Sequence, residues 1–266
     1  MNRNNIVSLP GITPSRTANL SGHLKLDGSW MEEGYPVGVW KYYIYDGVFQ
    51  NQEMLDATIV NANGETVAKH PKSLTTDRLG SPKFKDLNED GKIDRNDWAI
   101  IGDPNPDFIF SWTNNFTYRN FDLSVFINGS YGNDILNMGR GENAQVSPFA
   151  SQRSSMLNYW TPQNTNTDIP APRTAPHANL ILSSWMIEDG SYVRLKNLVL
   201  GYRFPVKKVI ESMRVYVSAQ NLVTLTNYSG FDPEVNSRGQ SNLQLGVDWN
   251  SYPTSRVFLL GVNVAF

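Results

Sequence analysis

The sequence has 266 residues, of which 23 are basic and 25 acidic, giving a formal net charge of -2 at pH 7. This balance lacks the strongly basic surface that holds a phosphate backbone, so nucleic acid is not an expected partner. Cysteine is absent, which excludes disulfide bonds, thiolate metal ligands and a cysteine nucleophile. No apolar run is long enough for a transmembrane helix, but the short alternating strands of a membrane β-barrel would escape this criterion.

The N-terminal third predicts short elements separated by polar turns. Residues 1–34 are rich in Asn, Ser and Pro, with one candidate strand at Leu20 to Trp30. Aromatic and β-branched residues alternate loosely over Tyr35 to Gln50, and Asp46-Gly47 suits a turn. We therefore expect a strand or a hairpin there. Residues 51–82 predict one short helical or irregular piece, followed by a polar linker.

Residues 86–97 have the spacing of an EF-hand calcium loop. Ca²⁺ prefers oxygen ligands around a tight turn, with glycine at the sixth position and a backbone carbonyl at the seventh. Gly91 occupies the sixth position, and Lys92 would contribute its carbonyl. The alternative is an Asx-rich turn without metal, because Asp, Asn and Gly favour turns in any case. The predicted ligand residues are Asp86, Asn88, Asp90, Lys92, Asp94 and Asp97, the last an Asp where Glu is usual.

The clearest β signal is a hairpin over residues 108–128. Apolar and polar residues alternate along both halves, and Arg119-Asn120 can form a two-residue turn between them. Each half is close to the roughly 9 to 11 residues that a tilted strand needs to cross a bilayer. The apolar side holds Phe108, Phe110, Trp112, Phe116 and Tyr118 in the first strand, and Phe121, Leu123, Val125 and Ile127 in the second.

Two long loops and two more strands follow the hairpin. Residues 132–182 contain five prolines and no sustained alternation, which predicts a long functional loop. We expect strands at Tyr192 to Phe204 and Met213 to Leu222, and a second loop at Thr226 to Thr254. Outer-membrane barrels place such long loops outside the cell.

The last segment, Arg256 to Phe266, alternates again and ends on an aromatic residue. This pattern is typical of the C-terminal signal by which outer-membrane barrels are handed to their insertion machinery. The last strand of a soluble β-sandwich can end in the same way. The residues of the candidate signal are Phe258, Leu260, Val262, Val264 and Phe266.

An ordered set of motifs resembles the SusC/RagA family of TonB-linked outer-membrane proteins, and covers about residues 34 to 266. The first two blocks are GYPVG followed by YDGVFQNQ, and FKDLNEDGKID followed by IGDPNPDF. Shorter blocks follow in the same order. They are NFDL at 120–123, GNDI at 132–135, DGSYVRLKNL at 189–198, AQNL at 219–222 and GFDPE at 230–234.

The resemblance implies an all-β fold in which the whole of 1–266 is the C-terminal part of an antiparallel, transmembrane barrel of about 22 strands. It further implies an outer-membrane location and import of a bulky nutrient, such as an oligosaccharide or peptide. A SusD-like surface lipoprotein, the TonB-ExbB-ExbD complex, outer-membrane lipid and the barrel-insertion machinery are the implied partners. No plug domain, TonB box or secretory signal is recognisable. We expect those parts upstream in a longer parent, since the strands here are too few to close such a barrel.

Other chemistry finds little support in the sequence. No hydrolase elbow, phosphate loop, dinucleotide fingerprint or zinc-protease motif is present, so we expect no enzymatic activity and name no catalytic residue. Asp232 and Glu234 flank Pro233 in a predicted loop, and we expect them to be solvated. Two alternatives stay open: a soluble extracellular β-sandwich that binds calcium or carbohydrate, and a non-functional truncated remnant. Alternation alone does not distinguish a sandwich from a barrel.

Overall fold

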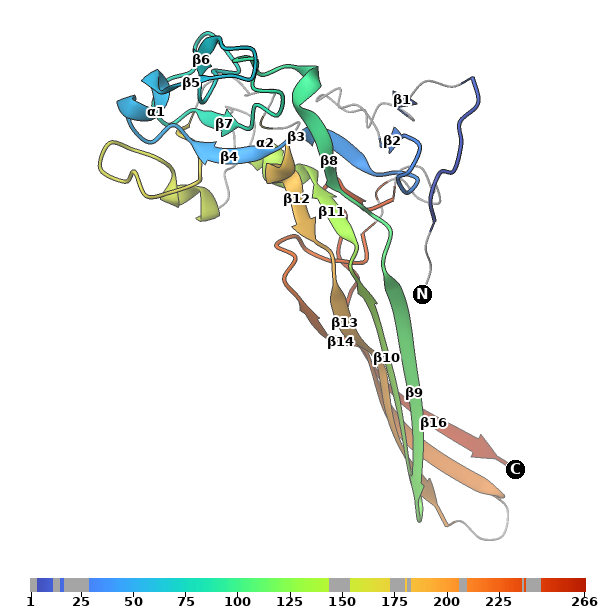
Figure 1. Cartoon of the computed structure of the whole chain (residues 1–266). Coiled ribbons are helices and arrows are strands. Elements are labelled where there is room, and N and C mark those ends of the chain that lie inside the picture. The colour runs from blue at the N-terminus through green and yellow to red at the C-terminus, as the bar shows by residue number, and fades with distance from the viewer. Residues whose placement is uncertain are drawn as a thin grey trace.

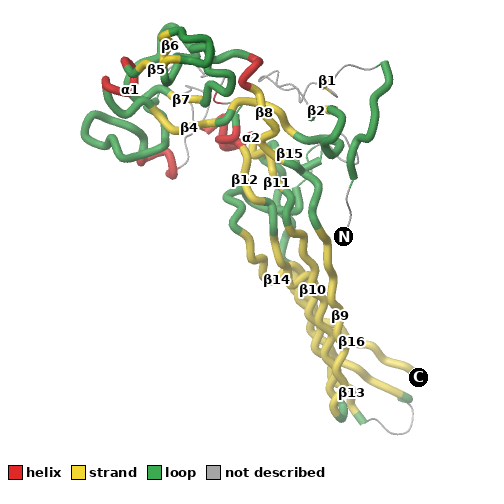
Figure 2. Tube along the Cα trace, viewed as in Figure 1, coloured by secondary structure: helices red, strands yellow, loops and turns green. Residues whose placement is uncertain are grey.

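A computed structural model describes residues 4–11, 15–16, 29–143, 154–172, 180, 183–205, 210–235, 237 and 245–266. These residues form two parts, a cap of short strands and turns and a long sheet that projects from it (Figure 1). The helices, red in Figure 2, lie in the cap and not in the long sheet. In the described part of the chain, no helix is long and apolar enough to cross a membrane.

The long sheet has five antiparallel strands in the order β16-β14-β13-β10-β9. β9 and β10 are joined by a two-residue turn, whereas cap elements lie in the chain between β10 and β13 and between β14 and β16. Each strand runs antiparallel to its neighbours. The strands are β9 (Phe108–Tyr118), β10 (Phe121–Tyr131), β13 (Tyr192–Phe204), β14 (Ser212–Thr226) and β16 (Val257–Ala265).

Among the described residues, the cap contains the β1-β2 pair, four other small sheets and several short helices. Its strands are β1 (Ser15–Arg16), β2 (Trp30–Met31), β3 (Trp40–Tyr43), β4 (Tyr45–Val48), β5 (Thr58–Val60), β6 (Thr66–Ala68), β7 (Pro82–Phe84), β8 (Trp98–Gly102), β11 (Asp134–Asn137), β12 (Ile187–Asp189) and β15 (Val247–Asp248). The other four sheets are β3-β8, β4-β7, β5-β6 and β12-β11-β15. The helices are α1 (Gln52–Asp56), α2 (Met138–Asn143), η1 (Arg95–Asp97), η2 (Ser154–Asn158) and η3 (Ser184–Met186).

One face of the long sheet is apolar and exposed. Successive side chains of a strand point to opposite faces, so register decides which residues share a face. A single row across the five strands shows the result, and four of its members are about half exposed or more. The row is Phe116 (50% exposed), Leu123, Leu200 (45%), Val217 (50%) and Leu260 (72%). We call this side of the sheet the apolar face.

The opposite side is the polar face. Its neighbouring row runs Thr117, Asp122, Gly201, Tyr216 and Gly261. Arg214 of β14 reaches across β13 to Asp122 of β10, with Nε 2.9 Å from one carboxylate oxygen. The absence of a side chain at Gly201 permits this, because a Cβ there would lie 2.6 Å from both groups. Charged and hydroxyl side chains thus line one side while hydrocarbon lines the other.

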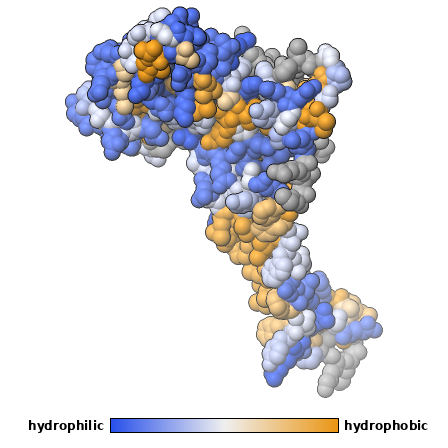
Figure 3. Space-filling model, in the orientation of Figure 1, coloured by the Kyte–Doolittle hydropathy of each residue, from blue (hydrophilic) through white to orange (hydrophobic). Residues whose placement is uncertain are grey.

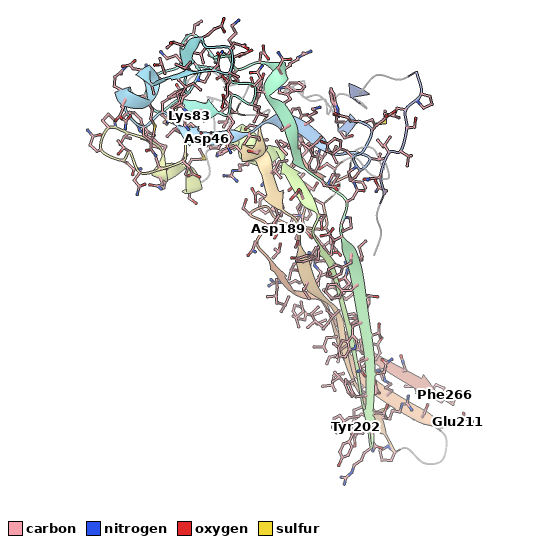
Figure 4. The ribbon with its side chains drawn as sticks, in the orientation of Figure 1. Asp46, Lys83, Asp189, Tyr202, Glu211 and Phe266 are labelled. Carbon is pink, nitrogen blue, oxygen red and sulfur yellow. The ribbon has the colours of Figure 1, made fainter. Side chains whose placement is uncertain are left out.

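The conventional hydrophobic core lies in the cap. Large buried side chains from β3, β7, β11 and η3 meet there, including Trp40, Phe84, Leu136 and Met186, none more than 1% exposed. Five aromatic pairs among the described residues of this region are edge-to-face, one of the favoured arrangements of aromatic rings. Nearby, Lys83 of β7 is paired with Asp46 of β4, and Figure 4 shows the two side chains together in the cap. The cap is therefore rigidly packed while the sheet below is not covered on its apolar face.

The expected all-β fold is confirmed, and the hairpin at 108–128 and the strand at 192–204 form at the predicted places. The stretch from Tyr35 to Gln50, expected to form a strand or a hairpin, forms two strands, β3 and β4. They pair with β8 and β7 and not with each other, so the hairpin alternative is wrong. The predicted loop at 132–182 holds β11 and α2, and the loop at 226–254 holds β15. The strand predicted at Leu20 to Trp30 lies mostly outside the described residues.

Candidate functional site

The most strongly organised polar site lies where the polar face of the sheet meets the loops. At its centre is Arg194 of β13, which is 2% exposed. Its guanidinium binds Asp232 at 2.5 Å and Glu234 at 2.6 Å. The same group donates to the hydroxyls of Thr224 at 2.8 Å and Thr254 at 2.9 Å. One cation therefore joins two strands of the sheet to two separate stretches of loop.

Glu234 gathers further donors from the sheet. Lys196 Nζ lies 2.6 Å from it, the hydroxyl of Tyr192 lies at 3.0 Å and the amide of Asn128 lies at 3.1 Å. Asp232 is held in turn by the backbone N–H groups of Glu234 and Thr254 and by the Thr254 hydroxyl. We call these residues the Arg194 network: Asn128, Tyr192, Arg194, Lys196, Thr224, Asp232, Glu234 and Thr254.

The two cations of the network, Arg194 and Lys196, lie at a β-bulge in β13. The register of β13 skips Lys196 against both of its neighbours, so this residue is an extra one in the strand. Opposite it, β14 also bulges, and Asn221 there has a φ of 51°. The extra residue lets Leu195 and Leu198, three positions apart, both lie opposite apolar partners, Ile127 and Val125, while Arg194 and Lys196 both bind Glu234.

The two carboxylates are ionised by their partners. Burial alone would raise the pKa of Asp232, but hydrogen bonds from Arg194, Thr254 and the backbone outweigh it and lower the pKa to about 2. Burial acts in the same way on Glu234, and donors led by Lys196 and Asn128 lower its pKa. The charged groups of the network therefore use one another as hydrogen-bond partners. This arrangement suits holding the loops on the sheet and not acid–base catalysis.

The expectation that Asp232 and Glu234 are solvated is wrong. Asp232 is 5% exposed and the Glu234 side chain 19% exposed, because both are drawn into the network. Arg194, Lys196 and Tyr192 were not singled out by the sequence patterns. The signal that identifies them is the alternation in YVRLKNLVL, which puts two cations on one side of an otherwise apolar strand. A buried cation requires an anionic partner from elsewhere in the chain.

The predicted calcium loop is a series of tight turns held by its own carboxylates. Asp86 accepts hydrogen bonds from the backbone N–H of Asp90 and Gly91, at 3.3 and 2.8 Å. Asp90 accepts one from Lys92 N–H at 2.9 Å, and Asn88 accepts one from Asp90 N–H at 3.2 Å. Gly91 has a φ of 80°, the left-handed region that glycine adopts without strain.

The far end of this loop is closed by the other two predicted ligands. Asp94 and Asp97 form a capping box at the start of η1. The Asp94 carboxylate accepts a hydrogen bond from the backbone of η1, and the Asp97 carboxylate accepts one from the backbone N–H of Asp94. Asp97 is fully buried, and burial raises the pKa of its carboxyl. Within the part of the chain that the structure describes, no three His, Cys, Asp or Glu side chains form a group that could hold a metal ion. The calcium site stays a prediction.

The candidate C-terminal signal lies on the apolar face. Phe258, Leu260, Val262 and Val264 of β16 pair with Ala219, Val217, Val215 and Met213 of β14. All four are well exposed, and Phe266 is 82% exposed beyond the strand end. Figure 4 places Phe266 near Glu211 and Tyr202, at the end of the sheet far from the cap.

Known proteins share this sequence and fold, although no family model matches the chain. The chain is 37% identical to TonB-dependent receptor P3 of Formosa agariphila over 274 residues, covering 100% of this chain and 26% of the relative. It is 30% identical to TonB-dependent receptor SusC of Bacteroides thetaiotaomicron over 198 residues, covering 71% of this chain and 18% of the relative.

Solved structures of the RagAB peptide importer have the same fold. The open-open state matches 98% of this chain and 25% of the solved chain, with a TM-score of 0.65 and 22% identity. The closed-closed state matches 94% and 25%, with a TM-score of 0.62 and 23% identity.

A long antiparallel sheet with one apolar and one polar face, topped by a cap of loops, defines a segment of a membrane β-barrel wall. The chain belongs to the SusC/RagA family of TonB-dependent receptors. It spans about a quarter of the length of two curated relatives, TonB-dependent receptors P3 and P26 of Formosa agariphila. The family resemblance seen in the sequence motifs is confirmed.

Replacing Arg194 by Met should detach the loops from the sheet. The change leaves Asp232 and Glu234 without their central cation, a loss that costs ~3–5 kcal/mol when a buried pair is broken. We expect faster proteolysis within residues 231–256, measured by limited digestion and mass spectrometry. Lys196→Met is the matched control, since the Lys196 side chain is 33% exposed and its pair contributes under about 1 kcal/mol. Equal protection of both variants would contradict this role.

Acid should release the same loops in a defined range. A carboxyl whose pKa is lowered on folding stabilises the fold above its unfolded value and loses that contribution as pH falls through the folded value. For Asp232 this window runs from its ordinary 3.8 down to about 2. Digestion with pepsin, which works in this range, should accelerate there. Asp232→Asn should be digested at a rate that changes little over the window, and a transition above pH 5 would argue against the assignment.

Proposed function

We propose that this chain forms part of the wall and outer cap of an outer-membrane transporter. The transporter imports bulky nutrients, oligosaccharides or peptides, together with a SusD-like surface lipoprotein. The observation that carries the proposal is the exposed apolar row from Phe116 to Leu260, which crosses all five strands. Strands of 9 to 15 residues are long enough to cross a bilayer, which takes about 9 to 11.

Lipid is the environment that suits the apolar face. Soluble proteins rarely leave a continuous apolar area of this size in water. Figure 3 shows it as an orange zone along the sheet beneath the mainly blue cap. In a soluble β-sandwich this face would be covered by a second sheet, and no sheet among the described residues packs on it. The sandwich alternative is therefore not favoured, and the similarity to working receptors disfavours a non-functional remnant.

The polar face and the cap suit the inside and the mouth of a transporter. The Asp122–Arg214 pair, Tyr216 and the Arg194 network all lie on the side away from lipid. Barrels of this kind keep polar groups inside, and long loops lie at the extracellular end. The relatives are named as receptors and the RagAB structures as a peptide importer. These names agree with the expected lack of enzymatic activity and support nutrient import.

Energy and assembly would come from partners of the whole transporter. The TonB-ExbB-ExbD complex would power it through parts of the parent protein outside this chain. The barrel-insertion machinery would recognise the alternating segment from Phe258 to Phe266. The exposure of Phe258 (71%) and Phe266 (82%) leaves both rings free for that contact.

A charge on the apolar face should block insertion, whereas the same charge on the neighbouring residue should not. Val217→Arg places a guanidinium among lipid tails, which costs ~2–4 kcal/mol near the bilayer midplane. Ser218→Arg is the matched control, since Ser218 adjoins Val217 in β14 and faces the polar side. Both substitutions are made in TonB-dependent receptor P3 carrying this chain in place of the residues it matches, because the strands here are too few to close a barrel alone. Folding of these receptors into phosphatidylcholine vesicles, followed by protease protection, measures the difference. Equal insertion of both variants would place the apolar face outside lipid.

Transport is tested by grafting the chain into a whole receptor. The chain would replace the residues it matches in TonB-dependent receptor P3, and growth would be followed on a nutrient whose use depends on that receptor. We expect the graft to reach the outer membrane and to support growth, while a Val217→Arg graft should fail at both. A graft that reaches the membrane but never supports growth would overturn the transport proposal.

We also propose that residues 86–97 bind Ca²⁺ as a structural ion. Support comes from the ligand types, since Asp86, Asn88 and Asp90 present oxygens around the tight turn at Gly91. The carbonyl of Lys92 and the Asp94 and Asp97 carboxylates complete the set. Bound Ca²⁺ would compete with the backbone N–H groups that these oxygens now accept from.

Calcium binding should be visible through Trp98, which directly follows Asp97. Tb³⁺ luminescence excited through this ring should appear and be displaced by Ca²⁺, with a Kd in about the 10⁻⁴ to 10⁻³ M range of extracellular calcium modules. Asp90→Ala should abolish the signal. Asp56→Ala, at the exposed end of α1, is the control. No displaceable signal at millimolar Ca²⁺ would leave the loop an Asx-rich turn.

A further inference from the structure

One hydrophilic side chain, that of Asn114, lies in the middle of the apolar face. Asn114 belongs to β9 and pairs with Val125 of β10. The four central rows of this face begin on β9 at Phe110, Trp112, Asn114 and Phe116. Among the paired residues of these four rows, Asn114 is the only amide, hydroxyl-bearing or charged side chain. It is therefore an exception that the proposed lipid contact does not explain.

The place of Asn114 along β9 keeps its amide away from both surfaces of a bilayer. It comes six residues after Phe108 and four before Tyr118, the two ends of the strand. At about 3.3 Å per residue and a tilt of about 45°, these ends lie roughly 14 and 9 Å from it along the membrane normal. The side chain makes no hydrogen bond with the described part of the chain. An amide left unpaired in hydrocarbon is costly, so a polypeptide partner is expected.

Two large rings flank Asn114 on the same strand and the same face. Trp112 is 48% exposed and Phe116 is 50% exposed. In the four central rows the inner strands β10, β13 and β14 carry only aliphatic side chains or glycine, and β16 adds the ring of Phe258. Aromatic residues are enriched in protein interfaces, and polar side chains join polypeptides within membranes. The outward side of β9, at one edge of the sheet (Figure 1), thus has the composition of a protein contact.

The membrane restricts how a second copy can meet this surface. Both caps must lie on the same side of the bilayer, so two copies are related by a twofold axis along the membrane normal. A residue near that axis meets its own counterpart at the same depth. An amide suits this place, because its N–H donates and its carbonyl oxygen accepts, and two Asn114 side chains can therefore form a reciprocal pair. The rings of Trp112 and Phe116 can likewise pack against their counterparts.

We propose that two copies of the whole receptor associate in the membrane through the outward side of β9. Asn114 pairs with the partner's Asn114, between the contacts of the Trp112 and Phe116 rings. The inference rests on the proposed function, because it needs the apolar face to lie in a bilayer. It goes beyond that function by assigning the outward side of one strand to protein and that of the inner strands to lipid.

Cross-linking between single cysteines tests the contact. The chain has no cysteine, so each variant is made in TonB-dependent receptor P3 carrying this chain in place of the residues it matches, with any cysteine of P3 replaced by Ser. Phe116→Cys should form a disulfide-linked dimer in outer-membrane preparations under mild oxidation. Leu200→Cys is the matched control and should form little dimer. Leu200 lies in the same row two strands away, about 10 Å from Phe116 in each copy.

The role of the amide is tested in the Phe116→Cys receptor. Asn114→Leu should weaken dimer formation about 3- to 15-fold, as expected for the loss of a polar pair between membrane segments. Asn115→Leu is the control, because Asn115 adjoins Asn114 in β9 and lies on the polar face opposite Ser124. It should leave the yield of dimer unchanged.

The outcomes separate this contact from the proposed function. A receptor that does not reach the outer membrane contradicts the proposed function, and the contact with it. A receptor that reaches the membrane but cross-links equally in the Phe116→Cys and Leu200→Cys variants overturns the contact alone. Dimer formation that is unchanged by Asn114→Leu also overturns it. If that substitution instead impairs folding of the receptor, the partner of Asn114 lies within its own barrel.

Discussion

The long sheet has no hydrophobic core beneath it, and this constraint shapes the rest of the molecule. Its apolar face displays residues such as Leu260 at 72% exposure, a cost in water that contact with other apolar groups removes. Cross-strand hydrogen bonds can hold five strands together, but they do not decide what covers the face. The buried core that does form lies in the cap, around Trp40 and Met186. The part of the chain that packs a core of its own is thus separate from the part whose apolar face lies open.

The Arg194 network connects these two parts. It ties β10, β13 and β14 to the loops around Asp232 and Thr254 through one nearly buried guanidinium. A network of this kind is weak support for overall stability, since desolvation offsets much of the attraction. Its value lies in position, because a loop held at Asp232 and Thr254 cannot swing across the polar face.

Much of the sheet could be predicted from the sequence because alternation directly encodes which residues share a face. Phe108 to Tyr118 and Tyr192 to Phe204 were predicted to the residue. Alternation does not encode partners, so the sequence left open whether residues 35–50 form one strand or a hairpin. The structure has two strands there, and their partners are β8 and β7. Asp232 was misjudged for a related reason. Its burial depends on Arg194, 38 residues away, and no local pattern carries that contact.

The bulge at Lys196 has a consequence for how this strand can evolve. Side chains alternate between the two faces of a strand, so adding or losing one residue moves every later side chain to the opposite face. Lys196 is the extra residue of the bulge, and it shifts the alternation between Arg194 on its N-terminal side and Leu198 on its C-terminal side. Substitutions elsewhere in β13 can accumulate one at a time. A deletion at 196 would turn one half of the strand over against the other, so its length is under tighter selection than its composition.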